Sequence, residues 1–106
     1  MEQKKYSIIL SRRADIMLLK HTEFLAQVSP AAARRLLKEF QSATGFLVSN
    51  PFQYPFADSL DAPGIPLATY RKCLFEGRYK ALFLIEEDDV YIDAIIDCRQ
   101  ENKKLY

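Results

Sequence analysis

Residues 70–99 read YRKCLFEGRYKALFLIEEDDVYIDAIIDCR. Three apolar runs follow one another in this stretch, separated by Glu76-Gly77 and by the acidic residues Glu87 to Asp89. Each run is too short for a helix and is rich in aromatic, leucine and β-branched residues. Short apolar runs with turn residues between them are typical of adjacent strands. The stretch therefore predicts an antiparallel three-stranded meander.

Basic residues lie at the ends of these predicted strands and across the first turn. Because the first and third strands of a meander flank the second, we expect these cations to gather in one area of a sheet face. The predicted cationic cluster consists of Arg71, Lys72, Arg78, Lys80 and Arg99.

Upstream of the meander, residues 6–10 alternate weakly between apolar and polar and predict a short first strand. Ser11 can cap a helix that begins near Arg12. Apolar residues then recur at spacings of three and four up to Val28, which predicts an amphipathic helix.

Ser29-Pro30 is a restart signal, with serine as the N-cap and proline at the first helical position. The second helix is expected to reach about Val48, and Asn50-Pro51 ends it because the residue before proline avoids the α region. Two amphipathic helices joined by so short a turn should form an antiparallel hairpin.

Residues 51–66, PFQYPFADSLDAPGIP, carry four prolines and one glycine, so neither a helix nor a central strand fits. The segment is too apolar for a disordered linker, and we expect an ordered connection over one edge of the core. The fold class is then α+β: strand, helix hairpin, meander and a short C-terminal tail, in a single domain spanning 1–106.

Composition is ordinary for a globular protein, with 49% hydrophobic residues, 27% charged residues and a net charge of +1. The N-terminus does not resemble a signal peptide, and no apolar run approaches the roughly 18 residues of a membrane span. Cys73 and Cys98 have no metal-ligand neighbours in the sequence, and we expect reduced thiols and a cytoplasmic location.

Strict alternation places Tyr79, Ala81, Phe83 and Ile85 of the second strand against the helices, together with Val90, Ile92, Ala94, Ile96 and Cys98 of the third. The opposite, open face would then carry Lys80 and Arg99. It would also carry Leu82, Leu84 and Ile95, which are too many apolar residues for a solvated surface. Either the chain's own tail or a partner should cover them.

Several enzyme classes are excluded, because the dinucleotide, P-loop, nucleophile-elbow, zinc-protease and CxxC motifs are absent. His21, the one histidine, falls on the apolar stripe of the first helix and is expected to be a hydrogen-bonded core residue. The acidic run 86–89 is expected to be a solvated hairpin tip. Asp93 and Asp97 are expected to pair with Lys80 or Arg99 rather than bind a metal ion, and no cofactor is predicted.

The cationic cluster has two interpretations. Cations on a sheet face with interspersed tyrosines can bind phosphate and stack on unpaired bases, as proteins that hold single-stranded RNA do. Lysine and arginine at a sheet edge also simply block unwanted strand pairing. The tyrosines concerned are Tyr70, Tyr79, Tyr91 and Tyr106.

The segment 77–100, GRYKALFLIEEDDVYIDAIIDCRQ, and the helix hairpin before it resemble the RelE/ParE family of bacterial type II toxins. The resemblance covers essentially the whole chain. It implies a RelE-like fold and a toxin that inhibits growth, partnered by a small antitoxin. We expect the antitoxin to bind the open face through Leu82, Leu84 and Ile95.

For the ribosome-dependent members, the resemblance implies an mRNA endoribonuclease that inhibits translation without a metal ion, through attack of a 2′-hydroxyl on the neighbouring phosphate. Lys80 occupies the position of a family arginine on the scissile phosphate, and Arg99 that of the basic residue ending the last strand. Tyr106 resembles the C-terminal tyrosine, completing a predicted catalytic set. The predicted RNA-binding residues are Arg71, Lys72, Arg78 and Tyr79.

Two alternatives remain open at this stage. The ParE branch of the same family inhibits DNA gyrase and has no nuclease activity. A third possibility is a member that has lost activity and persists as a DNA-linked or antitoxin-binding module.

Overall fold

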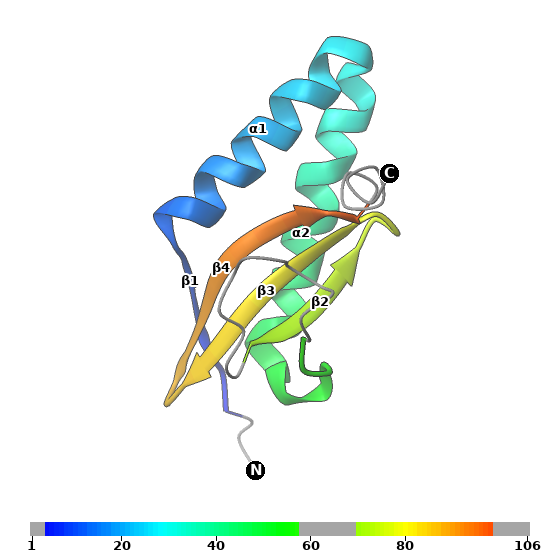
Figure 1. Ribbon diagram of the computed structural model, residues 1–106. Coiled ribbons are helices and arrows are strands. Elements are labelled where there is room, and N and C mark those ends of the chain that lie inside the picture. Colours follow the sequence, from blue (N-terminus) through cyan, green and yellow to red (C-terminus); the bar gives the residue numbers. More distant parts are fainter. Residues whose placement is uncertain (1–3, 58–69, 99–106) are drawn as a thin grey trace.

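The computed structural model describes residues 4–57 and 70–98. The elements follow the predicted order of strand, helix hairpin, connection and meander (Figure 1). They are β1 (Ser7–Leu10), α1 (Arg12–Val28), α2 (Pro30–Ser49), the 3₁₀ turn η1 (Pro51–Gln53), β2 (Arg71–Phe75), β3 (Tyr79–Glu86) and β4 (Asp89–Asp97). The predicted α+β architecture is confirmed, and the predicted tail from Arg99 onward lies outside the described residues.

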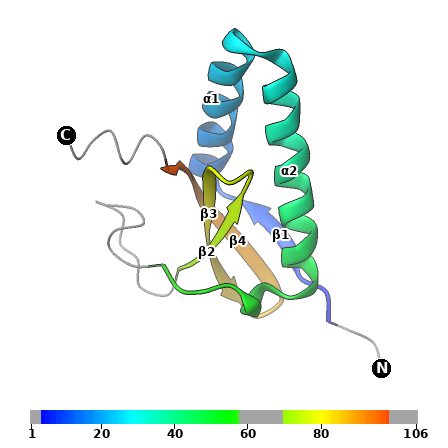
Figure 2. The ribbon, with the colours of Figure 1, turned by 90° about the vertical axis from the view of Figure 1, so that its right-hand side faces the viewer.

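The four strands form one mixed sheet in the order β1-β4-β3-β2. The meander β2-β3-β4 is antiparallel, and β1 pairs with β4 in parallel. The α1–α2 hairpin covers one face of this sheet, as the side view shows (Figure 2). In the described part of the chain, no helix has the length and apolar character needed to cross a membrane.

Both predicted serine caps are present. The Ser11 Oγ accepts a hydrogen bond from the Ala14 N–H at 3.0 Å, and the Ser29 Oγ accepts one from the Ala32 N–H at 3.2 Å. Such caps satisfy N–H groups that the first helical turn leaves without partners. Ser29 therefore ends α1 and begins α2 in one residue, which keeps the hairpin turn short.

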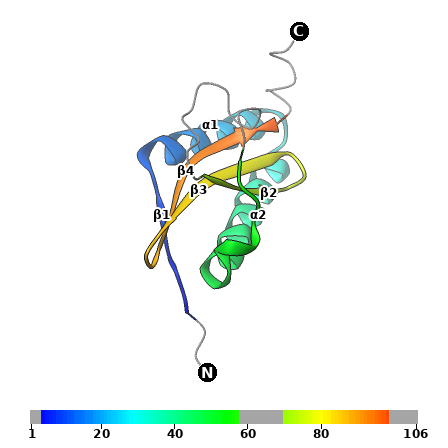
Figure 3. The same cartoon turned by 60° about the horizontal axis from the view of Figure 1, so that its bottom comes forward.

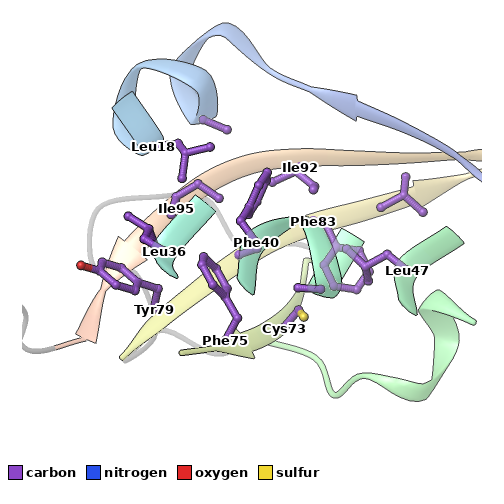
Figure 4. Packing of buried hydrophobic residues seen from close by; sticks show 14 residues of the cluster. Leu18, Leu36, Phe40, Leu47, Cys73, Phe75, Tyr79, Phe83, Ile92 and Ile95 are labelled. Atoms are coloured by element: carbon purple, nitrogen blue, oxygen red, sulfur yellow. The ribbon is translucent and has the colours of Figure 1, made fainter. Parts of the chain in front are cut away.

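The core lies between the hairpin and the sheet (Figure 4). Its largest fully buried side chains include Tyr79, Phe83, Leu36, Leu47, Ile92 and Ile95. Three aromatic rings extend it along one side, with Phe75 5.6 Å from Phe40 and 5.7 Å from Tyr79 between ring centroids. The predicted apolar stripe of α2 is largely buried, whereas in α1 only Ala14 and Leu18 are buried, and Phe24 and Val28 near its end are exposed.

A β-bulge interrupts the pairing of β3 with β4. Leu82 lies opposite Ala94 and Phe83 lies opposite Ile92, so Asp93 is an extra residue in β4. Side chains beyond a bulge follow a shifted alternation. The two strands are therefore regular on either side of this point but not across it.

The bulge makes part of the predicted face assignment wrong. Ile95 packs in the core against the helices, whereas Ala94 and Ile96 pack with Leu82 on the opposite face. Asp97 lies opposite the core residue Tyr79, on the helix side. The predicted strict alternation placed each of these four residues on the wrong face of the sheet. It did so because it counted Asp93 as part of a regular strand.

The first part of the predicted ordered connection is confirmed. After η1, Phe56 forms an isolated antiparallel bridge with Arg71, which lays this segment against the outer edge of β2. Figure 3 shows the segment after α2 passing along β2. The remainder of the predicted connection, residues 58–66, lies outside the described residues.

Candidate functional site

The predicted cationic cluster does not form as a whole among the described residues. Lys72 and Lys80 point to the open face, because Lys72 pairs with Leu82 and Lys80 alternates with the core residues Tyr79 and Ala81. Lys80 is buried, with 6% of its surface exposed. Two of the predicted residues, Arg99 and Tyr106, lie outside the described residues.

Arg71 contacts the segment that follows α2. Its guanidinium carbon lies 4.1 Å from the centre of the Phe56 ring and 5.3 Å from that of Phe52. Its Nη1 donates to the Tyr54 carbonyl at 2.6 Å. Cation–π contacts and a carbonyl acceptor use the donors that phosphate binding would need. Arg71 therefore anchors the connection.

Arg78 forms a two-pronged ion pair with Asp97. Its Nε donates to Asp97 Oδ1 at 3.1 Å and its Nη2 donates to Oδ2 at 2.8 Å. These hydrogen bonds raise the pKa of Arg78. Asp97 is 3% exposed, so the pair joins the start of β3 to the end of β4 in a largely buried position. Sequence reasoning did not identify Arg78 as the partner of Asp97.

Tyr79, a predicted RNA-binding residue, lies in the core, where its ring is not exposed for stacking on a base. The residue is 1% exposed. Its ring packs 5.2 Å from the ring of His21 and 5.7 Å from that of Phe75. The physical reason is its position on the helix side of β3, where its ring fills the core.

Asp93 gathers polar contacts from two other parts of the chain. Arg13 of α1 donates to its carboxylate through Nη2 at 2.5 Å and to its carbonyl through Nε at 3.2 Å. The Tyr70 hydroxyl donates to the same carboxylate, and the Ser11 hydroxyl donates to the carbonyl at 3.1 Å. These contacts satisfy the backbone and side chain of the bulge residue.

Burial alone would raise the pKa of Asp93, but the Tyr70 hydroxyl and the Arg13 charge outweigh it and lower this pKa. The hydrogen bond to Asp93 raises the pKa of Tyr70. A hollow of about 430 Å³ opens beside this group. It is lined by Ser11, Tyr70, Leu84, Glu86, Tyr91 and Asp93. Nothing in the sequence pattern indicated that Arg13 would reach Asp93.

The three predicted antitoxin contacts differ in accessibility. Leu82 and Ile95 are fully buried within the chain, while Leu84 is half-buried and lines the 430 Å³ hollow. Leu82 packs with Ala57 and Tyr70 as well as with β4. The chain itself therefore covers the apolar residue that was expected to need a cover.

His21 is hydrogen-bonded as predicted, since its Nε2 lies 2.9 Å from the Ile95 carbonyl oxygen, but it is half-buried and lies at the margin of the core. Cys73 and Cys98 are not joined in a disulfide bond, and burial raises the pKa of Cys73. A protonated, buried thiol is a poor nucleophile. In the ranges 4–57 and 70–98, no group of three histidine, cysteine or acidic residues is placed to hold a metal ion.

No model of a known protein family matches this chain, and no curated protein is similar to it in sequence. Solved structures do match. One is a chain of the "Chromosomal ParDE TA system from P. aeruginosa", with a TM-score of 0.65 and 17% sequence identity. The match covers 88% of this chain and 96% of that one. This chain therefore has the fold of a component of that ParDE system.

Proposed function

We propose that this chain is the toxin of a type II toxin–antitoxin pair. The observation that carries the proposal is the likeness to a chain of a ParDE system over nearly the full length of both chains. At 17% sequence identity and a TM-score of 0.65, this likeness is one of fold. A small antitoxin, encoded beside the gene, is the expected partner.

We further propose that the toxin acts by binding a protein target, as gyrase-inhibiting members of the family do. The contacts of the predicted RNA-binding residues support this choice. Arg78 is engaged by Asp97, Arg71 by ring faces and a carbonyl, and Tyr79 is buried. An RNase of this kind needs cations directed at a phosphate, and these two arginines are directed elsewhere.

Cleavage of mRNA is the second candidate, and the position of Lys72 and Lys80 on the same open face favours it. With Arg99 and Tyr106 they would form the catalytic and RNA-binding set that the family resemblance implies. Primer extension on a reporter mRNA after induction tests this candidate. Defined cuts inside translated codons that disappear with Lys80→Ala would establish it in place of the protein-binding action.

Induced expression in growing cells tests the toxin proposal itself. Growth should stop after induction and resume when the small protein encoded beside the gene is expressed with it. A matched control is Leu36→Asp, which places a charge at a fully buried core position and should remove toxicity by unfolding the chain. Undiminished growth with a soluble, folded wild-type chain would contradict the proposal.

A further inference from the structure

β2 is the outermost strand on its side of the sheet, and the strand position beside it is half filled. The Ala57 N–H donates to the Tyr70 carbonyl at 2.8 Å, and the Lys72 N–H donates to the Pro55 carbonyl at 3.0 Å. Pro55 has no N–H to donate in return. The added segment therefore stops pairing at Pro55 and leaves the second half of β2 uncovered by it.

The uncovered half is centred on Leu74. In an antiparallel pair, the residues whose N–H and C=O groups face one edge alternate along the strand. Tyr70 and Lys72 face outward, so Leu74 faces outward too. Within residues 4–57 and 70–98, the Leu74 N–H donates no hydrogen bond to another backbone group outside the sheet pairing, and the residue is 64% exposed.

A hollow of about 360 Å³ lies beside this edge, between α2 and the end of β2. Phe46, which is 62% exposed, and Tyr54 provide aromatic surface there. Glu39 and Glu76 provide negative charge, and no lysine or arginine is among the described residues that line the hollow. Glu76 contacts Arg35 at 3.3 Å, while no ion pair of Glu39 is recorded within residues 4–57 and 70–98.

We propose that this edge and hollow bind a short extended peptide segment of a partner protein. The segment adds a strand beside Leu74, in line with residues 55–57. It inserts an apolar side chain between Phe46 and β2, and it places a lysine or arginine beside Glu39. Main-chain pairing supplies affinity in strand addition, and the pockets for alternate side chains supply specificity. This binding function goes beyond the toxin proposal and does not depend on it.

A second copy of this chain does not fit the same position. Antiparallel pairing of two β2 strands about Leu74 would bring Glu76 of one copy opposite Lys72 of the other. The place beside Lys72 is already occupied by Pro55. A narrow peptide avoids this collision, and the acidic lining selects a basic one.

The test is amide exchange at Leu74, followed by NMR in the full chain with and without the synthetic peptide Ac-Lys-Val-Thr-Val-Lys-NH₂. The free chain should exchange this outward N–H rapidly. A saturating amount of peptide should slow it about tenfold or more, because a bound strand accepts its hydrogen bond. The acidic peptide Ac-Glu-Val-Thr-Val-Glu-NH₂ should have little effect. Equal protection by both peptides, or protection by neither, would overturn the proposal.

Two pairs of substitutions locate the site. Phe46→Ser should weaken binding of the basic peptide, while Phe24→Ser, at a comparably exposed position on α1, should leave it unchanged. Glu39→Gln should weaken binding and reduce its dependence on salt, while Glu23→Gln on α1 should do neither. Equal effects within either pair would place the peptide elsewhere and overturn the assignment. Peptide binding is measured on the chain in vitro, so its outcome is independent of any effect of the chain on growth.

Discussion

The Asp93 carboxylate accepts hydrogen bonds from the charged guanidinium of Arg13 and from the neutral hydroxyl of Tyr70. It thereby links the bulge of β4 to α1 and to Tyr70. Its pKa is lowered below the ordinary value of 3.8. The stabilisation from this carboxylate is therefore fully present above pH 3.8 and is lost as the pH falls through the lowered, folded value.

Asp93→Asn should reduce the free energy of unfolding by about 1–3 kcal/mol at pH 7, because it replaces charge-assisted hydrogen bonds with weaker ones. The difference from wild type should shrink below pH 3.8. Urea unfolding at both pH values measures it. Asp88→Asn is the control. Asp88 also pairs with a cation, Lys4, but its side chain is 75% exposed, and so exposed a pair contributes little to stability. A difference that is independent of pH would show that the charge of Asp93 does not contribute.

The Arg78–Asp97 pair is more buried than the Lys4–Asp88 and Arg35–Glu76 pairs. Arg78→Met should lower the free energy of unfolding by about 3 kcal/mol, because it leaves a buried carboxylate without its two-pronged partner. Arg35→Met removes a pair whose arginine is 64% exposed and should change stability by less than about 0.5 kcal/mol. Similar losses in the two variants, measured by urea unfolding, would mean that burial does not decide the contribution.

At the level of the elements, the helices could be predicted from the sequence almost to the residue. Ser11 and Ser29 both cap as expected, and local signals of this kind depend on neighbours in the chain. The bulge could not be predicted, because Asp93 is held by Arg13 and Tyr70, which are remote in sequence. One unrecognised extra residue was enough to misplace Ala94 through Asp97.

Deleting Asp93 tests this account of β4. The shortened strand would alternate regularly and keep Ile92 and Ile95 on the helix side. We therefore expect ΔAsp93 to fold cooperatively and to lose about 1–3 kcal/mol, chiefly from the missing polar contacts. Deleting Tyr91 instead would turn Ile92 outward and Asp93 inward, and should abolish cooperative unfolding. Circular dichroism during urea unfolding compares the two, and equal tolerance would contradict the assigned register.

For the whole molecule, the sequence predicted the architecture better than the arrangement of the candidate site. Hydrophobic periodicity determined which surfaces meet in the core, and this is why the hairpin and meander were predicted correctly. The positions of long arginine side chains depend on their partners in the fold, such as Asp97 for Arg78 and the ring of Phe56 for Arg71. Only the folded chain brings these partners close to the arginines. The predicted roles of Lys80, Arg99 and Tyr106 remain predictions.

We propose that this chain acts as a toxin by binding a protein target, and DNA gyrase is the target of the ParE branch of the family that the sequence resembles. The most direct measurement is the supercoiling of relaxed plasmid by purified gyrase in the presence of increasing amounts of this chain. We predict inhibition that saturates with concentration, and that is reversed by the protein encoded beside the gene. Full supercoiling activity at a large molar excess of the folded chain would contradict the claim.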